Sequence, residues 1–422
     1  EVGTTIYRPP YAPLSFAAIA GRNSYEYYDP ERKSPIHNWH ITNGAVFEDV
    51  GQWKRPWYFP INKDETMDEA VQRESKNVRE NAGVLDGSTL GKIEIKGKDA
   101  LAFMNLIYTN SFSKMKPGTS RYALMLGEDG MVKDDGIICK ISDEHFIATT
   151  TTGGAATVLG CMEEYAQTEW PNLNVYMNSI TEQYATFNIS GPKTRNIIEK
   201  VFPEVNFSNE AFPFMTFQFH EYEDTPIRIL RASFTGEMGY EIYVPSNQAV
   251  KMWEKIISFG KEFGLMPYGT ETMHLLRAEK GYIIVGQDTD GSITPLDLGL
   301  DWMIGKSKKD FLGKRSLIRS DTVRKDRKQL VGILPTNKNE KLEEGQHIIL
   351  DKEIKTPTPM LGHITSCYQS PTLGHNFALA VIKNGQSLIG TKAFASTPEL
   401  KTIEVEIVEP IFYDKENTKL AS

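Results

Sequence analysis

The stretch RYALMLGEDGMVKDDGIICKI, residues 121–141, places a strand-like segment on each side of the turn sequence GEDG. This pattern predicts two antiparallel strands joined as a hairpin. Two adjacent carboxylates, Asp134 and Asp135, lie just inside the second strand. Because successive side chains of a strand point to opposite faces, only one of them can face a pocket. The structural alternative is an acidic pair that solvates the mouth of the hairpin.

Length and composition limit the class of protein. The chain has 422 residues, of which 40% are hydrophobic and 24% charged, and it contains no apolar run long enough to cross a bilayer. These values predict a globular protein of two or three domains with no membrane partner. The net charge of -8 is spread along the chain without a dense basic stripe, so we expect no nucleic-acid partner.

Cysteine, histidine and glycine usage bears on compartment and cofactors. Cys139, Cys161 and Cys367 lie far apart and are odd in number, which favours a reducing, cytoplasmic location. The histidines show no paired spacing, so no metal site is predicted. The stretches TTTTGGAATVLGCM at 149–162 and LGKRS at 312–316 match neither a GxGxxG motif nor a P-loop, so no nucleotide site is predicted.

The chain divides into blocks of different pattern. Residues 1–64 are irregular and aromatic, opening near TTIYRPPYAP, and we expect an extension that packs on the body of the protein or on partner subunits. The pattern becomes periodic from Glu65 onwards. DEAVQRESKNVREN at 68–81 predicts a helix, KIEIKG at 92–97 predicts a strand, and Asp99 is the expected N-cap of the next helix.

Two further groups could contact a ligand. In RASFTGEMGYEIYVP, residues 231–245, a strand is interrupted at Thr235 and Gly236 and then resumes. Glu241 could accept two N–H bonds from an amino-pyrimidinone edge, whereas a glycine-rich hairpin with solvated acids is the structural alternative. Within the helix predicted for YGTETMHLLRAEKGY, Arg277 could pair with a ligand carboxylate or form an ordinary surface ion pair.

The middle and last blocks differ in their elements. A strand at 184–189, a helix after Pro192, strands around 226–244 and a helix near 246–264 suit a ferredoxin-like unit. From about Lys328 the chain contains short strands at regular spacing and no long helix, as a small barrel or sandwich requires. These strands are KQLVGILP, QHIILD, GHITSC, FALAVI and TIEVEIVEPIF.

Five motifs together resemble the aminomethyltransferase family typified by the glycine-cleavage T-protein, over about residues 65–414. They are RYALMLGEDGMVKDDGII, FNISGPKTR, FTGEMGYEIYVP, LLRAEKG and GHITSCYQSPTLGHNFALAVI. The resemblance implies an α+β, three-domain cloverleaf around a central tetrahydrofolate channel. It implies a discontinuous first domain of residues 65–180 and about 265–325, a ferredoxin-like domain of residues 181–264, and a C-terminal β-barrel of residues 326–422.

The resemblance also implies roles for individual residues. In this family the second acid of the doublet faces the folate, which makes Asp135 the catalytic carboxylate. A carboxylate there could stabilise a methylene iminium cation and accept the proton lost by the attacking folate nitrogen. Glu241 would hold the pterin edge, and Phe234 stands where the T-protein pattern has Tyr. The implied cofactor-binding set is Tyr122, Ile137, Phe234, Glu241 and Arg277.

Departures from the T-protein pattern indicate one branch of the family. LDGSTLGKIEI replaces the sequence that begins FDVSHM, with Thr89 in place of its His. The folate-dependent half of sarcosine oxidase alpha subunits is resembled by the stretch from YRPPYAP through AVFEDVGQWKRPWYFP, together with EKGYIIVGQDTDGSITPLDLGLDW and KKDFLGKRSL. The resemblance implies capture of the methylene iminium or formaldehyde unit from sarcosine oxidation, forming 5,10-methylenetetrahydrofolate.

The same branch implies partners and leaves alternatives open. A flavin-binding beta subunit and small sarcosine oxidase subunits are the expected partners. FMN or FAD and NAD are expected only on partner subunits or on a missing N-terminal half, because this chain has no motif for them. The alternatives are a free-standing glycine-cleavage aminomethyltransferase and a non-catalytic folate-binding module.

Overall fold

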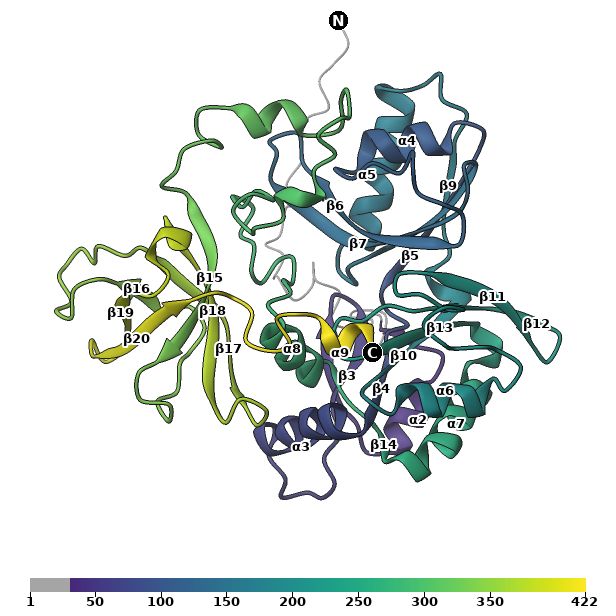
Figure 1. Ribbon diagram of the computed structural model, residues 1–422, viewed down its shortest axis with the longest axis horizontal. Helices are drawn as coiled ribbons and strands as arrows, with labels where there is room; N and C mark the ends of the chain where they lie inside the picture. The colour runs from purple at the N-terminus through teal and green to yellow at the C-terminus, as the bar shows by residue number, and fades with distance from the viewer. Residues whose placement is uncertain (1–30) are drawn as a thin grey trace, which may run out of the picture.

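The protein folds into three lobes around helix α8 (Thr270–Glu279), which lies at the centre (Figure 1). The computed structural model describes residues 31–422, so the proline-rich stretch at 4–13 lies outside the described residues. The first and second lobes each contain a β-sheet with helices packed on it, and the third is a closed β-barrel. The predicted α+β class with a C-terminal barrel is confirmed.

The first lobe contains a five-stranded sheet with the strand order β6-β7-β8-β5-β9. Its elements are β5 (Gly91–Lys96), α4 (Ala100–Ile107), β6 (Thr119–Leu126), β7 (Val132–Ser142), β8 (His145–Thr150), α5 (Ala155–Thr168) and β9 (Tyr176–Ser179). Helices α4 and α5 cover one face of this sheet (Figure 1). Phe103, Met104 and Met162 from the helices pack against Ile138 and Phe146 of the sheet in one fully buried core.

The predicted hairpin of β6 and β7 is confirmed, and its register shows which side chains share a face. The antiparallel pairing places Leu124 opposite Asp135 and Met125 opposite Asp134. Directly opposed residues lie on the same face of a sheet. Met125 belongs to the core beneath α4 and α5, whereas Leu124 belongs to a core shared with the barrel. Asp134 and Asp135 therefore point to opposite sides of this sheet.

The first two predicted helices form, and only the first is capped by a side chain. Helix α3 (Met67–Glu80) begins with a capping box in which Thr66 and Glu69 bond each other's backbone N–H groups. Asp99 immediately precedes α4, but its carboxylate accepts a hydrogen bond from the Asn174 backbone N–H at 2.8 Å and does not cap the helix. Asp99 therefore occupies the predicted N-cap position, but its side chain makes no capping hydrogen bond because a long-range partner occupies it.

The second lobe contains a six-stranded sheet with the order β11-β12-β13-β10-β4-β14. Its elements are β4 (Ala82–Asp86), β10 (Tyr184–Ser190), α6 (Thr194–Val201), β11 (Phe217–Tyr222), β12 (Thr225–Leu230), β13 (Gly239–Pro245), α7 (Ala249–Gly260) and β14 (Leu265–Pro267). Strands β4 and β14 lie outside the range 181–264 expected for this unit. All five residues of β4 are buried, because this strand lies between β10 and β14.

Residues 31–64 are more regular than expected. They form a three-stranded sheet with the order β1-β3-β2 and one short helix. The elements are β1 (Arg32–Lys33), α2 (His37–Thr42), β2 (Val46–Val50) and β3 (Trp53–Tyr58). Trp39 contacts Trp253 of α7 edge to face at 5.2 Å, and the Trp57 indole N–H donates to Glu271 of α8 at 2.9 Å. This part of the chain therefore packs on the second lobe and on the central helix.

The third lobe is a closed barrel with the strand order β15-β18-β17-β16-β19-β20. Its strands are β15 (Lys328–Pro335), β16 (His347–Ile349), β17 (Gly362–Ser370), β18 (His375–Lys383), β19 (Lys392–Ser396) and β20 (Thr402–Val408). Five of these were predicted, and β19 was missed because KAFAS is short and weakly apolar. After the barrel the chain returns to the centre and ends in α9 (Thr418–Ala421) (Figure 1).

Candidate active site between two facing sheets

The two sheets share one apolar core on the face of the first sheet that α4 and α5 leave free. Cys139 and Ile147 of the first sheet pack in this core with Phe217, Leu230 and Tyr243 of the second. Side chains on the facing sides of β7 and β13 therefore point into the same region between the lobes. The predicted carboxylates Asp135 and Glu241 lie on these two strands.

Asp134 lies on the helix-covered side of the first sheet and is only 3% exposed. Its carboxylate accepts hydrogen bonds from the backbone N–H and the hydroxyl of Thr151, both at 3.1 Å, just before α5 begins. It lies so close to Gly154 that a Cβ added there would approach Asp134 Oδ2 to 1.8 Å. Asp134 thus braces the loop between β8 and α5 from a buried position. The structural alternative, in which this acid solvates the mouth of the hairpin, is therefore excluded for Asp134.

Asp135 lies on the opposite side and is partly exposed. Its Oδ2 accepts a hydrogen bond from the Tyr122 phenol at 2.6 Å. Tyr122 is directly opposite Ile137 on the neighbouring strand, so all three side chains share the face that points away from α4 and α5. The hairpin therefore brings together three of the predicted site residues.

Burial governs the protonation of both acids. It raises the pKa of Asp135 to about 7; the Tyr122 hydrogen bond opposes this rise and the charge of Asp134 adds to it. Burial also raises the pKa of Asp134 to about 6, against the hydrogen bonds from Thr151 and the Asp135 backbone N–H. A carboxyl group with the pKa of Asp135 can both take up and release a proton near neutral pH.

Glu241 lies on β13, on the face of the second sheet that points toward the first, and is 8% exposed. Oε1 accepts a hydrogen bond from the Asn188 side-chain amide at 2.9 Å, and Oε2 accepts one from the Tyr243 phenol at 2.5 Å. Burial raises the pKa of Glu241, while the Tyr243 and Asn188 bonds and the nearby Arg228 charge oppose the rise. The carboxylate is therefore held in one orientation by donors on both oxygens.

Ile137 and Phe234 supply apolar surface near the carboxylates. Ile137 packs at the edge of the core shared by the two sheets. Phe234 lies in the loop between β12 and β13, and its ring stacks on Tyr282 with centroids 6.0 Å apart. Gly236 in that loop has φ +84°, a conformation that favours glycine, and a Cβ there would approach the Lys280 side chain to 2.9 Å. The interruption expected in this stretch is confirmed.

Arg277 differs from its expectation. Its side chain is completely buried, and its guanidinium donates to Asp288, to the Tyr282 carbonyl at 3.0 Å and to the Ser366 hydroxyl at 2.7 Å. These contacts join α8 to the following loop and to the barrel. Arg277 is therefore neither a surface ion pair nor exposed to a ligand in this structure, because α8 lies at the meeting point of the three lobes.

Lys92 is a buried residue near the site that the sequence did not single out. It is 1% exposed, and its ammonium group donates to the carbonyls of Ser88 and Leu90, each at 3.0 Å. Burial lowers the pKa of Lys92 to about 7, and the charges of Asp86 and Glu241 oppose this shift. Its place in an alternating strand did not indicate that Lys92 is buried, because the residue before it is glycine. The residues that bury it come from the other lobe.

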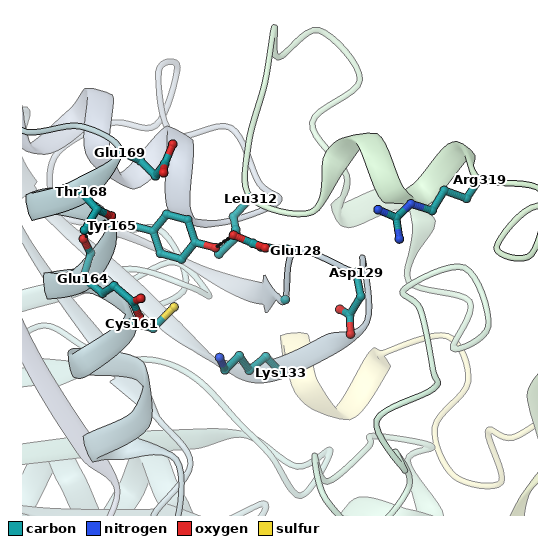
Figure 2. A pocket seen from close by; sticks show the side chains of 11 residues that line it. Glu128, Asp129, Lys133, Cys161, Glu164, Tyr165, Thr168, Glu169, Leu312 and Arg319 are labelled. Carbon is teal, nitrogen blue, oxygen red and sulfur yellow. Dashed lines mark hydrogen bonds between the residues drawn. The ribbon is translucent and has the colours of Figure 1, made fainter. Parts of the chain in front are cut away.

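A hollow of about 660 Å³ lies elsewhere, between the β6–β7 turn, α5 and the segment before the barrel (Figure 2). None of the predicted site residues lines it. Its lining residues are Gly127, Glu128, Asp129, Lys133, Cys161, Glu164, Tyr165, Thr168, Glu169, Leu312 and Arg319. The buried carboxylates, and not this hollow, define the candidate site. Among residues 31–422 no group of three His, Cys, Asp or Glu side chains is arranged to hold a metal ion.

Comparisons with known proteins identify the class to which this fold and site belong. Residues 36–308 match the GCVT N-terminal domain, and residues 328–414 match the glycine cleavage T-protein C-terminal barrel domain. The chain belongs to the glycine cleavage T-protein family of aminomethyltransferases. The family resemblance predicted from the sequence motifs is thereby confirmed, and the family implies tetrahydrofolate use.

Named relatives fall into two groups. The chain is 49% identical to sarcosine oxidase subunit alpha of Corynebacterium sp. (strain P-1), over 99% of this chain and 43% of that protein. It is 40% identical to the subunit of the same name in Rhizobium meliloti (strain 1021), over 100% of this chain and 43% of that protein. The aminomethyltransferase of Alkaliphilus metalliredigens (strain QYMF) is 30% identical, over 92% of this chain and 99% of that protein. The chain thus spans less than half the length of the two sarcosine oxidase relatives.

A solved structure supports the fold. The glycine cleavage system aminomethyltransferase T from Bartonella henselae superposes with a TM-score of 0.78 at 22% identity, covering 91% of this chain and 98% of that one. The predicted aminomethyltransferase fold is confirmed. In the part of the chain that the structure describes, no helix is long and apolar enough to cross a membrane. Together the relatives indicate a folate-related one-carbon transfer module.

Proposed function

We propose that this chain is the folate-dependent part of a sarcosine oxidase, and that it transfers the one-carbon unit released by sarcosine oxidation to tetrahydrofolate, giving 5,10-methylenetetrahydrofolate. The observation that carries the proposal is the pairing of Asp135 with Tyr122 on a face that shares its core with the strand of Glu241. In this arrangement, Asp135 supplies a carboxylate that exchanges protons, and Glu241 supplies a fixed hydrogen-bond acceptor for the pterin edge. Both carboxylates border the same region between the lobes.

Proton balance defines the task of Asp135. A methylene iminium and tetrahydrofolate give methylenetetrahydrofolate, the free amine and one proton. The two folate nitrogens that form the bridge each lose one proton; the first of these protons must reach the departing amine, and the second is released. With its pKa raised by burial to about 7, Asp135 can take the first proton and return it to the amine. While ionised, it also stabilises the iminium cation electrostatically.

Binding and orientation fall to the other residues. The pterin edge presents adjacent N–H donors, and the Glu241 carboxylate can accept two of them as charge-assisted hydrogen bonds. Tyr122, Ile137 and Phe234 supply apolar and aromatic surface for the ring. Arg277 is left out of this set, because its buried guanidinium is already paired with Asp288.

The oxidation step belongs to partners in this proposal. The sequence contains no GxGxxG or P-loop motif, so flavin and NAD would be held by a flavin-binding beta subunit, by small subunits, or by the part of the alpha subunit that this chain does not span. The 49% identity to a sarcosine oxidase subunit alpha over nearly all of this chain supports that assignment.

A free-standing aminomethyltransferase is the second candidate, since relatives of that name align over 99% of their own length. Thr89 replaces the His of the T-protein pattern, and its hydroxyl lies 3.1 Å from that of Thr152.

The test is titration calorimetry of the isolated chain with tetrahydrofolate, together with its visible spectrum. We expect folate binding without flavin absorbance and without sarcosine oxidation. Stoichiometric flavin, or one-carbon transfer from a lipoyl carrier protein but not from a sarcosine-oxidising partner, would contradict the proposal.

A further inference from the structure

Four polar side chains form a row across three neighbouring strands of the second sheet. Asn188 of β10 is directly opposite Glu241 of β13, and Arg228 of β12 is directly opposite Tyr243. Because residues 241 and 243 are two apart on one strand, all four side chains lie on the face that points toward the first lobe. The row is buried: Arg228 is 5% exposed and Tyr243 is 2% exposed.

We propose that Asn188 and Tyr243 are positioning residues, which hold the Glu241 carboxylate in the orientation that receives the pterin edge. The inference rests on the proposed role of Glu241 as the pterin acceptor. The inference adds that Glu241 depends on the hydrogen bonds from Asn188 and Tyr243, and that neither of these donors needs to touch the ligand.

The hydrogen-bond capacity of the carboxylate supports this assignment. An ionised carboxylate has about four lone-pair sites, two on each oxygen. The Asn188 amide occupies one site on Oε1, and the Tyr243 phenol occupies one on Oε2. One site per oxygen is left, which matches two adjacent N–H donors on an amino-pyrimidinone edge. The same two bonds prevent the carboxylate from rotating away from them.

Both donors are suited to a permanent holding role. An amide facing a carboxylate can only present its NH₂ group, because its own oxygen would be repelled. Tyr243 has its pKa raised well above its usual value by burial and by the Glu241 charge, so its phenol stays protonated and keeps donating. The Arg228 guanidinium lies over the Tyr243 ring, 4.0 Å from its centroid, and helps to hold the ring in place.

The pH dependence of ligand binding distinguishes holding from mere packing. Tyr243, Arg228, Asn188 and, from the first sheet, Lys92 all favour the ionised form of Glu241, while burial opposes it. Binding should strengthen as pH rises through the pKa of Glu241, because only the carboxylate offers both acceptor sites. Removing either donor raises that pKa further, so the rising part of the binding curve moves to higher pH.

The experiment is calorimetric titration of tetrahydrofolate into the folded chain between pH 5 and pH 9. We expect Asn188→Ala and Tyr243→Phe each to weaken binding about tenfold at neutral pH, to shift the rising limb to higher pH, and to leave the circular dichroism spectrum unchanged. Tyr240→Phe is the matched control, because Tyr240 lies on the same strand with its side chain in the core on the opposite face. It should keep the wild-type pH curve.

A double-mutant comparison completes the test. In a Glu241→Gln background, Asn188→Ala and Tyr243→Phe should cause little further loss, because they act through the carboxylate. Unchanged affinity in both single variants, an equal loss at every pH, or an undiminished loss in the Glu241→Gln background would overturn the inference. If Asn188→Ala does not fold, Tyr243→Phe decides the question alone. Wild-type affinity in Glu241→Gln would place Glu241 outside the site and so overturn the inference, whereas absence of folate binding by the wild-type chain would reject the proposed function.

Discussion

The Tyr122 phenol donates a 2.6 Å hydrogen bond to Asp135 across the hairpin of β6 and β7. Burial and the charge of Asp135 raise the pKa of Tyr122 well above its usual value, so the phenol remains a donor over the whole physiological range. Tyr122 therefore lowers the pKa of Asp135 against the opposing effect of burial. This contact therefore lowers the pH at which the carboxylate changes charge, against the larger effect of burial.

Replacing Tyr122 should move the pH profile of one-carbon transfer. Tyr122→Phe removes the donor, so the pKa of Asp135 rises above about 7 and the ionised base forms only at higher pH. We expect the rising limb of the rate profile to shift upward in pH, measured as methylenetetrahydrofolate formation in the reconstituted complex. Tyr108→Phe, a tyrosine in the core beneath the helices, is the control and should keep the wild-type limb. An unshifted limb in Tyr122→Phe would argue against control by this hydrogen bond.

The raised pKa of Asp135 also predicts a pH-dependent effect on stability. An unfolded aspartate has a pKa of about 3.9, and the folded group has one of about 7. The folded state thus binds more protons between these values, and this group's contribution to stability falls as pH rises through that range. Asp135→Asn removes the carboxylate, whose ionised form is disfavoured in the folded state, so it should raise the melting temperature at pH 8 more than at pH 5. Thermal unfolding at both pH values measures this, and an equal or reversed difference would contradict it.

Arg277 should prove structural. Arg277→Met leaves Asp288 as an uncompensated buried charge, so we expect the free energy of unfolding to fall by about 3–5 kcal/mol. Urea unfolding measures this loss, and Arg324→Met, at a half-exposed ion pair, should cost little. The fraction of Arg277→Met that remains folded should bind tetrahydrofolate with wild-type affinity. A stable variant that lost affinity would return Arg277 to the ligand site.

Glu241 should contribute to affinity through its charge. Glu241→Gln keeps the size of the side chain but turns one acceptor into a donor that faces the pterin N–H groups. We expect binding of tetrahydrofolate to weaken by roughly 2 kcal/mol or more, as for a buried charge-assisted hydrogen bond. Calorimetry that found unchanged affinity would place Glu241 outside the site.

The local pattern of the sequence was sufficient for much of the fold and for the hairpin. The turn sequence GEDG between two strand-like segments identified β6 and β7, and the opposite directions of Asp134 and Asp135 follow from the period of a strand. This pattern could not show that Asp134 is also buried. That burial depends on the loop at Thr151, which packs against the strand from beyond β8.

Contacts between distant segments account for what the sequence missed. The Asn188–Glu241 bond joins residues 53 apart, and the Arg277–Ser366 bond joins residues 89 apart. Neither separation leaves a periodic signal, so the support of Glu241 was not seen and Arg277 was expected at a ligand. Strand β4 gave no alternation because both of its faces are buried.

The most direct test of the account compares Asp135→Asn with Asp134→Asn in a complex reconstituted with sarcosine-oxidising partner subunits. The measured quantity is the ratio of methylenetetrahydrofolate to free formaldehyde for each sarcosine oxidised. We expect Asp135→Asn to retain sarcosine oxidation and most folate binding while this ratio collapses, because the carboxylate that exchanges the proton is gone. Asp134→Asn should stay nearer to the wild-type ratio, since Asp134 braces Thr151 on the other side of the sheet. A wild-type ratio in Asp135→Asn, or a collapse confined to Asp134→Asn, would contradict the account.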